Sequence, residues 1–180
     1  MSITIRPYRA SDLPRIQQLT VEAFEPVCID RNIEDCFGVI GDRDWAWRKA
    51  RHLTEDAERD PSGIHVAEID GAIIGYITTW SDHDSGIGNI PNLAVDRDYR
   101  GQGLGRQLIA FALDAFKDAG LSHARIETLD QNSAGQNLYP SMGFREVARQ
   151  IHYCMDLADR PGSKDTGSKD TGSKDTGSKE

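Results

Sequence analysis

The sequence predicts a domain of the α/β (α+β) class, built on a mixed, mostly antiparallel sheet of six to seven strands flanked by about four helices. Two observations carry this prediction. Asp70-Gly71 joins two apolar runs, and an Asp-Gly pair in that position is typical of an antiparallel hairpin. Amphipathic helical runs separate the later strands, and such crossover helices connect strands that need not be antiparallel.

The first third of the chain is expected to hold one strand and mostly helices. Ser11 and Asp44 are short polar residues in front of helical patterns, so each can cap a helix, and Pro61 ends the second helix. The expected elements are a strand at 3–9, a helix at 11–24, either a short helix or a folded loop at 26–43, and a helix at 45–59.

The remainder alternates strands with helices. Pro91 interrupts one strand, and because proline cannot donate to a ladder it suggests a bulge there. Gly120 and Gly143 each stand just beyond a helical pattern, where glycine commonly ends a helix. The expected elements are strands at 64–69, 72–80, 87–95 and 125–129, helices at 104–119 and 133–142, and one or two closing strands within 144–157.

Composition narrows the class of protein. The 180 residues carry a formal net charge of -8, which argues against a nucleic-acid partner and favours either attraction of a cationic amine or simple solubility. No apolar run reaches the roughly 18 residues of a membrane helix, and the start lacks a secretory pattern. Three cysteines without paired spacing indicate reduced thiols. We therefore expect a cytoplasmic protein with no membrane partner and no metal site.

The last twenty residues form a low-complexity segment. From Gly162 the unit Gly-Ser-Lys-Asp-Thr repeats three times and ends in Gly-Ser-Lys-Glu, with no apolar residue to anchor it to a core. Such composition is typical of disorder. The expected organisation is a folded domain at 1–160 and a disordered tail at 161–180.

A glycine-rich run after an apolar strand is the most informative motif. Alternating glycines leave backbone N–H groups uncovered, the helix start adds partial positive charge, and two arginines flank the turn. This combination favours a pyrophosphate-binding loop, although a plain tight turn is the alternative. The run consists of Arg100, Gly101, Gln102, Gly103, Leu104, Gly105 and Arg106.

Spacing tests two familiar pyrophosphate loops. Arg106 and Gln107 stand where a Walker A loop needs Lys and Ser or Thr, so a Mg-nucleotide site is not indicated. A dinucleotide fingerprint needs G-x-G-x-x-G near the first strand of its unit, whereas this run is G-x-G-x-G and lies past mid-chain. Neither loop fits the sequence.

Three segments together resemble the GNAT family of N-acetyltransferases. They are I-x-I-R-x-Y-R-A-S-D-L at the start, N-L-A-V-D-R-D-Y-R-G-Q-G-L-G-R-Q-L-I in the middle, and E-T-L-D-Q-N-x-x-x-x-N-L-Y-P-S-M-G-F near the end. The resemblance covers residues 1–157. It implies a sheet splayed at its central strands and acetyl-CoA as cosubstrate, with its pyrophosphate on the glycine-rich run.

The resemblance also assigns residues to the pantetheine arm of acetyl-CoA. It implies that Leu93, Ala94 and Val95 offer backbone groups to this peptide-like arm as a neighbouring strand would. The alternative is a plain core strand. That role uses the side chains, whereas binding of the arm uses the backbone, so both roles can hold together. Asn132 resembles a residue that bonds the arm or caps a helix, and Asn137 is a weaker candidate for cofactor binding.

Aminolysis of a thioester needs an acid and a base. Tyr139 occupies the position where the family often places the acid that protonates the departing thiolate; packing beside the cofactor is the alternative. The stretch 88–92 lacks the acidic residue that many family members carry there. Glu127 is the candidate base, spaced from Tyr139 as in ribosomal-protein alanine N-acetyltransferases, although it could instead pair with an arginine. The competing bases are Asp82, His83 and Asp84, which could equally form a solvated turn.

The acceptor is expected to bind within residues 25–60. Acidic and aromatic side chains there could receive a cationic amine, or the tryptophans could simply pack the helix on the sheet. These side chains are Asp30, Glu34, Asp35, Trp45, Trp47 and His52. The sequence thus predicts direct acetyl transfer to a primary amine by a monomer or homodimer. A non-catalytic acyl-CoA-binding module is the alternative, and a longer acyl chain on the donor also stays open.

Overall fold

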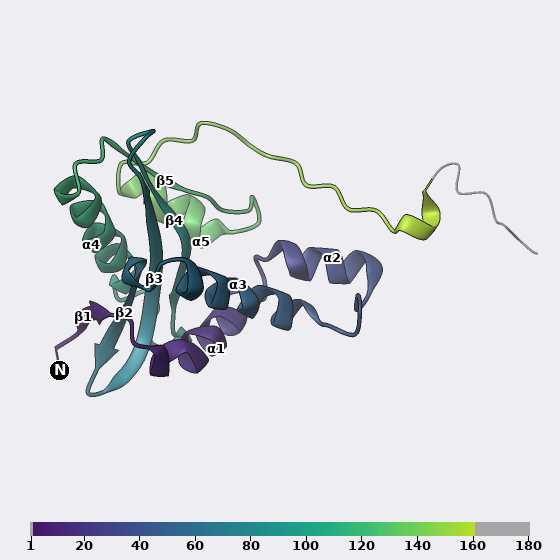
Figure 1. Ribbon diagram of the computed structural model, residues 1–180, viewed down its shortest axis with the longest axis horizontal. Coiled ribbons are helices and arrows are strands. Elements are labelled where there is room, and N and C mark those ends of the chain that lie inside the picture. Colours follow the sequence, from purple (N-terminus) through teal and green to yellow (C-terminus); the bar gives the residue numbers. More distant parts are fainter. Residues whose placement is uncertain (1, 161–180) are drawn as a thin grey trace, which may run out of the picture. The chain divides into compact units, whose positions relative to one another are not determined.

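The computed structural model describes residues 2–160, and the described residues up to Arg149 are built around one sheet (Figure 1). The predicted tail at 161–180 lies outside the described residues. The elements in chain order are β1 (Thr4–Pro7), α1 (Leu13–Phe24), α2 (Ile29–Phe37), α3 (Trp45–Arg59), β2 (Ile64–Ile69), β3 (Ala72–Asp82), β4 (Ile87–Val95), α4 (Leu104–Asp118), β5 (His123–Ile126) and α5 (Ser133–Ser141).

The strands follow the order β1-β2-β3-β4-β5 across the sheet. The first four pair antiparallel, and β5 pairs parallel to β4 after the crossover through α4. Asp70 and Gly71 both have positive φ, 50° and 82°, as the predicted two-residue hairpin requires. The predicted mixed, mostly antiparallel sheet is confirmed.

Alternating side chains of the strands build a hydrophobic layer on each face of the sheet. Val66 and Tyr76 face α1 and α3, while their neighbours Ala67 and Ile77 face α4. Figure 1 shows α4 on one side of the sheet and α1 and α3 on the other. The two layers fix β4 between helices on both faces.

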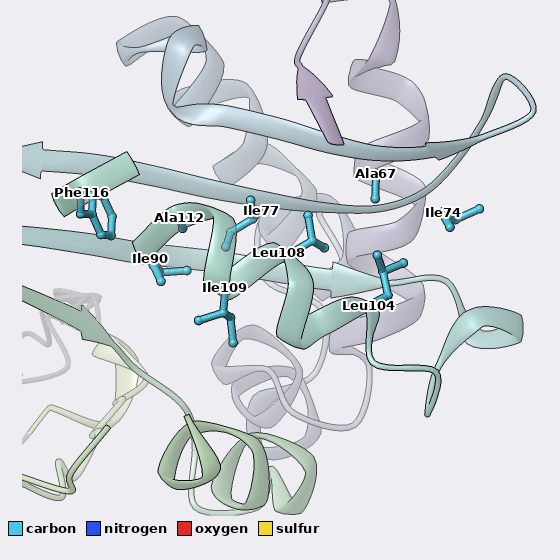
Figure 2. Close-up of a cluster of buried hydrophobic side chains, with 9 residues drawn as sticks. All are labelled: Ala67, Ile74, Ile77, Ile90, Leu104, Leu108, Ile109, Ala112 and Phe116. Atoms are coloured by element: carbon cyan, nitrogen blue, oxygen red, sulfur yellow. The ribbon is translucent and has the colours of Figure 1, made fainter. Parts of the chain in front are cut away.

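The layer under α4 is packed closely around the middle of β4. Figure 2 shows the inward side chains of α4 meeting those of the strands. Phe116 lies so close to β4 that a Cβ added to Gly88 would stand 2.4 Å from its ring. Only glycine leaves room for this ring, which is buried at 5% exposure.

The two helix caps predicted at Asp44 and Ser11 have different outcomes. Asp44 accepts a hydrogen bond from the Trp47 N–H at 2.8 Å and so caps α3. The predicted cap at Ser11 is wrong. Asp12 is the N-cap residue of α1 but makes no side-chain cap hydrogen bond to it; its carboxylate instead accepts from the Arg9 N–H at 2.8 Å, across the 3-10 turn Ala10–Asp12, and pairs with Arg6 at 2.7 Å.

The counts of strands and helices differ from the prediction within the described residues. The undecided segment 26–43 contains α2, which makes five helices, and the sheet has five strands in place of six to seven. The closing strands expected within 144–157 are absent, although Ile151, Tyr153 and Met155 alternate as a strand would. Alternation supplies only a strand's side-chain pattern, and a strand also needs a pairing edge.

The chain divides into two units, one ending at Arg149 and one beginning at Gln150. The elements described above all belong to the first unit. In the second unit the described residues contain one short 3-10 turn, Leu157–Asp159. The residues of the candidate site all belong to the first unit.

Candidate functional site

The sheet opens between β4 and β5, the last two strands in its order. The parallel pairing runs from Ile87↔His123 to Ile90↔Ile126, and β5 ends there while β4 continues to Val95. On the other side of β4 the register shifts between Thr78 and Trp80, as expected for the bulge at Pro91. Beyond Ile90, β4 therefore has no strand paired on this side within the described residues, and the splayed strands that the resemblance implies stay a prediction.

The backbone of β4 presents peptide groups to this opening. The Asp96 N–H donates to the Ile74 carbonyl of β3 at 2.8 Å. Antiparallel neighbours bond at every second residue, so Leu93 and Val95 turn their peptide groups away from β3 and toward the opening. Ala94 is buried and pairs with Tyr76 of β3, so its peptide groups face the other way.

The glycine-rich run follows β4 after the short 3-10 turn Arg97–Tyr99 and leads into α4. Gly101 and Gly103 have φ of 75° and 82°, a region that favours glycine, and a Cβ added to either would meet no atom within 4 Å. Gly103 is the N-cap of α4 and provides no side-chain cap, so the first N–H groups of the helix are left for another acceptor. This geometry suits an anion held by backbone amides.

The side chains of the same run mostly bind the protein itself. Arg100 donates to the Val95 carbonyl at 3.0 Å, and Gln102 donates to the Asp98 carbonyl at 3.1 Å. Arg106 donates to the Ser141 hydroxyl at 2.7 Å, which joins the start of α4 to the end of α5. These side chains shape the loop, and the loop's backbone supplies the anion-binding groups.

The helix α5 carries three of the predicted site residues. Asn132 caps it by accepting from the Gly135 N–H at 3.1 Å, and its amide also donates to the Thr128 hydroxyl at 2.8 Å. Its capping role is therefore confirmed, while a bond to the cofactor stays a prediction. Asn137 is exposed on the same helix.

Tyr139 and Glu127 lie in different environments. Tyr139 packs against the layer under α4, with its ring 6.2 Å from that of Phe144, and burial raises the pKa of its phenol. Glu127 follows the last residue of β5, is 71% exposed and pairs with Arg125 at 3.0 Å. The pairing with arginine named as the alternative for Glu127 is present, and its role as a base stays a prediction.

The competing bases form a turn at the end of β3. Asp82 accepts hydrogen bonds from the N–H groups of Asp84 and Ser85 at 3.1 and 3.2 Å. The Ser85 hydroxyl and N–H hold the pKa of Asp82 below its usual value. This turn accounts for the acidic cluster as local structure, and it makes Asp82 a weaker base than an ordinary carboxylate.

The segment expected to bind the acceptor is rich in internal ion pairs. Asp30 and Glu34 approach Arg48 at 3.5 and 3.4 Å, and Asp35 pairs with Arg31 at 3.0 Å. Each of the three carboxylates thus already has an arginine partner, although Asp30 and Glu34 share Arg48, so that three negative charges face two positive ones. A depression of about 250 Å³ lies beside them and is lined by Asp30, Trp47, Arg48, Arg51, His52 and Glu55.

The two tryptophans divide between packing and surface. Trp45 is buried at 7% exposure, as expected if a tryptophan packs the helix on the sheet. Trp47 is 41% exposed and lies under the Arg43 guanidinium, 4.7 Å from the ring centroid. Cations of the protein therefore already occupy the face that a cationic amine would use.

Two contacts around the opening were not anticipated from the sequence. Gln131, after β5, exchanges hydrogen bonds with Asn32 of α2 at 3.1 and 3.2 Å and donates to the Pro26 carbonyl at 2.9 Å. Lys49 and Asp56 of α3 are buried at 8% exposure each. Helical spacing places Lys49 and Asp56 on the inward face with Leu53, so charges on an apolar face were the available signal.

Neither a membrane-spanning helix nor a metal-binding group of side chains is found among the described residues. Between residues 2 and 160 no helix is long and apolar enough to cross a membrane. In the same range no group of three or more His, Cys, Asp or Glu side chains could hold a metal ion.

Sequence comparison finds an acetyltransferase model and acetyltransferase relatives. The model of the Acetyltransferase (GNAT) family matches residues 19–144. A mycothiol acetyltransferase of Thermomonospora curvata is 31% identical over 160 residues, which cover 82% of this chain and 52% of that protein. The chain thus spans about half the length of this relative. An N-alpha-acetyltransferase of Sulfurisphaera tokodaii is 31% identical over 118 residues, 59% of this chain and 71% of that protein.

Structural comparison finds the same fold. The PaiA N-acetyltransferase from Thermoplasma acidophilum, solved in complex with coenzyme A, aligns with a TM-score of 0.65 at 22% identity. The alignment covers 81% of this chain and 91% of that one.

Proposed function

The chain belongs to the GNAT acetyltransferase family, and we propose that it transfers the acetyl group of acetyl-CoA to a primary amine by direct attack in a ternary complex. The observation that carries this proposal is the continuity of two features. A strand that loses its neighbour at Ile90 is followed, after the short 3-10 turn Arg97–Tyr99, by a glycine-rich loop whose backbone amides lie at the start of α4. The unpaired edge of the strand suits the peptide-like pantetheine arm, and the loop suits the pyrophosphate attached to that arm.

Acetyl-CoA, when bound, supplies an activated thioester for attack by the amine. The backbone amides from Gly101 to Arg106 would hold its pyrophosphate. Gly101 and Gly103 both adopt positive φ, and a Cβ added to either would meet no atom within 4 Å. Leu93 and Val95 would bond the pantetheine arm through the peptide groups that point into the opening. Asn132 and Asn137 are proposed as weaker contacts of the same arm.

Proton transfer is assigned to two residues by the proposal. Tyr139 would protonate the departing thiolate, because a phenol whose pKa is raised by burial stays protonated throughout the neutral range. Glu127 would accept the proton of the amine directly or through water, which requires it to leave Arg125. Its high exposure makes that exchange inexpensive in free energy.

The acceptor is proposed to be a primary amine, either a small molecule or a peptide or protein amine. The names of the relatives point in more than one direction, since one refers to mycothiol and another to N-alpha-acetylation. We propose residues 1–160 as the catalytic domain. A monomer or homodimer stays the prediction for the oligomeric state, as does a cytoplasmic location.

A non-catalytic acyl-CoA-binding module is the second candidate. Two observations favour it: the stretch 88–92 lacks an acid, and Glu127 is engaged with Arg125. Calorimetry with acyl-CoAs of increasing chain length, followed by an assay of CoA release against small amines, peptide N-termini and lysine side chains, separates the two. Binding with turnover supports the transferase, and binding without turnover on any amine supports the module.

A further inference from the structure

A buried charged cluster lies behind β4, outside the residues assigned to the reaction. It consists of Lys49 and Asp56 on α3 and Asn92 on β4, which are 8%, 8% and 5% exposed. Charges are seldom buried to this degree, because removal from water costs several kcal/mol per ion unless partners compensate it. Each member of the cluster therefore needs its partners.

Asn92 is the centre of the cluster and uses both atoms of its amide. Its Oδ1 accepts from Lys49 Nζ at 2.9 Å, and its Nδ2 donates to Asp56 Oδ2 at 2.9 Å and to Thr78 Oγ1 at 3.3 Å. The Lys49 ammonium also lies 4.0 Å from the centroid of the Phe24 ring. Two opposite charges on one helix thus hold one strand side chain in a single orientation.

The held side chain stands just past an interruption in the pairing of β4. Pairing with β5 has ended at Ile90, Pro91 has no N–H to donate, and the ladder to β3 is irregular opposite Pro91. Asn92 is the first residue after these interruptions, and Leu93 follows it with its peptide groups turned into the opening. From Asn92 to Val95 the strand pairs regularly with β3, and the Asn92 side chain adds contacts to α3 at the residue where this pairing resumes.

We propose that Lys49 and Asp56, acting through Asn92, are positioning residues that hold Leu93 and Val95 in register for the pantetheine arm. This inference rests on the proposed function, because it assigns a purpose to the cluster only if the arm binds at the opening. The glycine-rich loop lies beyond Asp96, whose N–H bonds the Ile74 carbonyl of β3, and it has a hydrogen bond of its own from Gln102 to the Asp98 carbonyl, so we expect it to keep its shape when the cluster is removed.

The test compares two ligands that share the pyrophosphate. Coenzyme A carries the pantetheine arm, and adenosine 3′-phosphate 5′-diphosphate lacks it. In full-length Lys49→Met, which keeps the length of the side chain but removes its charge, calorimetry should show coenzyme A binding about tenfold more weakly, as for loss of one charge-assisted hydrogen bond. The affinity for the shorter ligand should not change.

Gln17→Leu provides a matched control. It removes another polar contact of α3, the bond from Gln17 Nε2 to Thr54 Oγ1 at 3.1 Å, without touching β4. Both affinities should stay at their wild-type values. If Lys49→Met weakens both ligands equally, or neither, the positioning role is wrong. If wild-type protein binds neither ligand, the proposed function fails first, so the two failures are distinguishable.

Two further variants keep the test decisive. Asp56→Asn preserves shape and removes the opposite charge, so it carries the comparison if Lys49→Met does not fold. Because Lys49 acts through Asn92, the double variant Lys49→Met/Asn92→Ala should bind coenzyme A no more weakly than Asn92→Ala alone. Additive losses in the double variant would show that Lys49 acts independently of Asn92.

Discussion

Replacing Gly103 by alanine tests the anion-binding loop most directly. Gly103 has φ of 82°, and an added Cβ would meet no protein atom within 4 Å, so the change creates no clash. Holding alanine in the left-handed region costs about 1–2 kcal/mol. If the backbone relaxes to negative φ, the N–H groups at the start of α4 turn away. Loss of one hydrogen bond to a charged oxygen is worth about 1.5–3 kcal/mol, or roughly 10- to 150-fold in affinity.

Gly120, at the other end of α4, offers a matched control. Its φ is 80°, and an added Cβ would also meet nothing within 4 Å. Gly103→Ala and Gly120→Ala should therefore lose similar free energy of unfolding in urea. Only Gly103→Ala should lose affinity for acetyl-CoA in calorimetry. Equal affinities for acetyl-CoA in the two variants would refute the assignment of the loop.

Three more predictions concern the acid, the core and the response to pH. Tyr139→Phe should lower kcat roughly 100-fold. In the wild type, kcat should not fall through loss of the acid across the neutral range, since burial raises the pKa of the Tyr139 phenol. A pH-rate profile in which Tyr139→Phe has the wild-type kcat contradicts this role. Gly88→Ala should cost about 1–3 kcal/mol of stability because its Cβ overlaps Phe116, with acetyl-CoA affinity retained; a wild-type melting temperature would contradict the packing. Asp12 has a pKa lowered by the Arg6 guanidinium, so its contribution is present above about 3.8 and is lost as pH falls through the folded value; Asp12→Asn should flatten the acid loss of stability in urea titrations, and an unaltered acid limb would contradict the pairing.

Local patterns predicted most of the elements because each depends on neighbours in sequence. The run from Trp45 to Arg59 has a cap and a terminator within a few residues, and α3 has the predicted bounds. The hairpin at Asp70-Gly71 requires only two positive φ angles. The strand predicted at 125–129 instead runs from His123 to Ile126, because its end is set by where β4 stops pairing.

The candidate site was predicted unevenly for a similar reason. The glycines of the loop could be found from their alternation, because positive φ is a property of single residues. The arginines flanking the loop were expected to face an anion, whereas Arg100 and Arg106 bind Val95 and Ser141. Spacing shows that a cation is near a turn, but it does not show which acceptor lies closest.

The sequence by itself determined the hairpin, the glycine-rich loop and every described α-helix except α2, because their signals lie within a few residues of each other. Only the tertiary structure decided which peptide groups of Leu93–Val95 face the opening, since that depends on pairing with β3 and on the early end of β5. It likewise brought Lys49 and Asp56 to Asn92 across 43 and 36 positions of sequence. Hydrogen bonds over such separations follow from the packing of a helix on a sheet, and no local pattern encodes them.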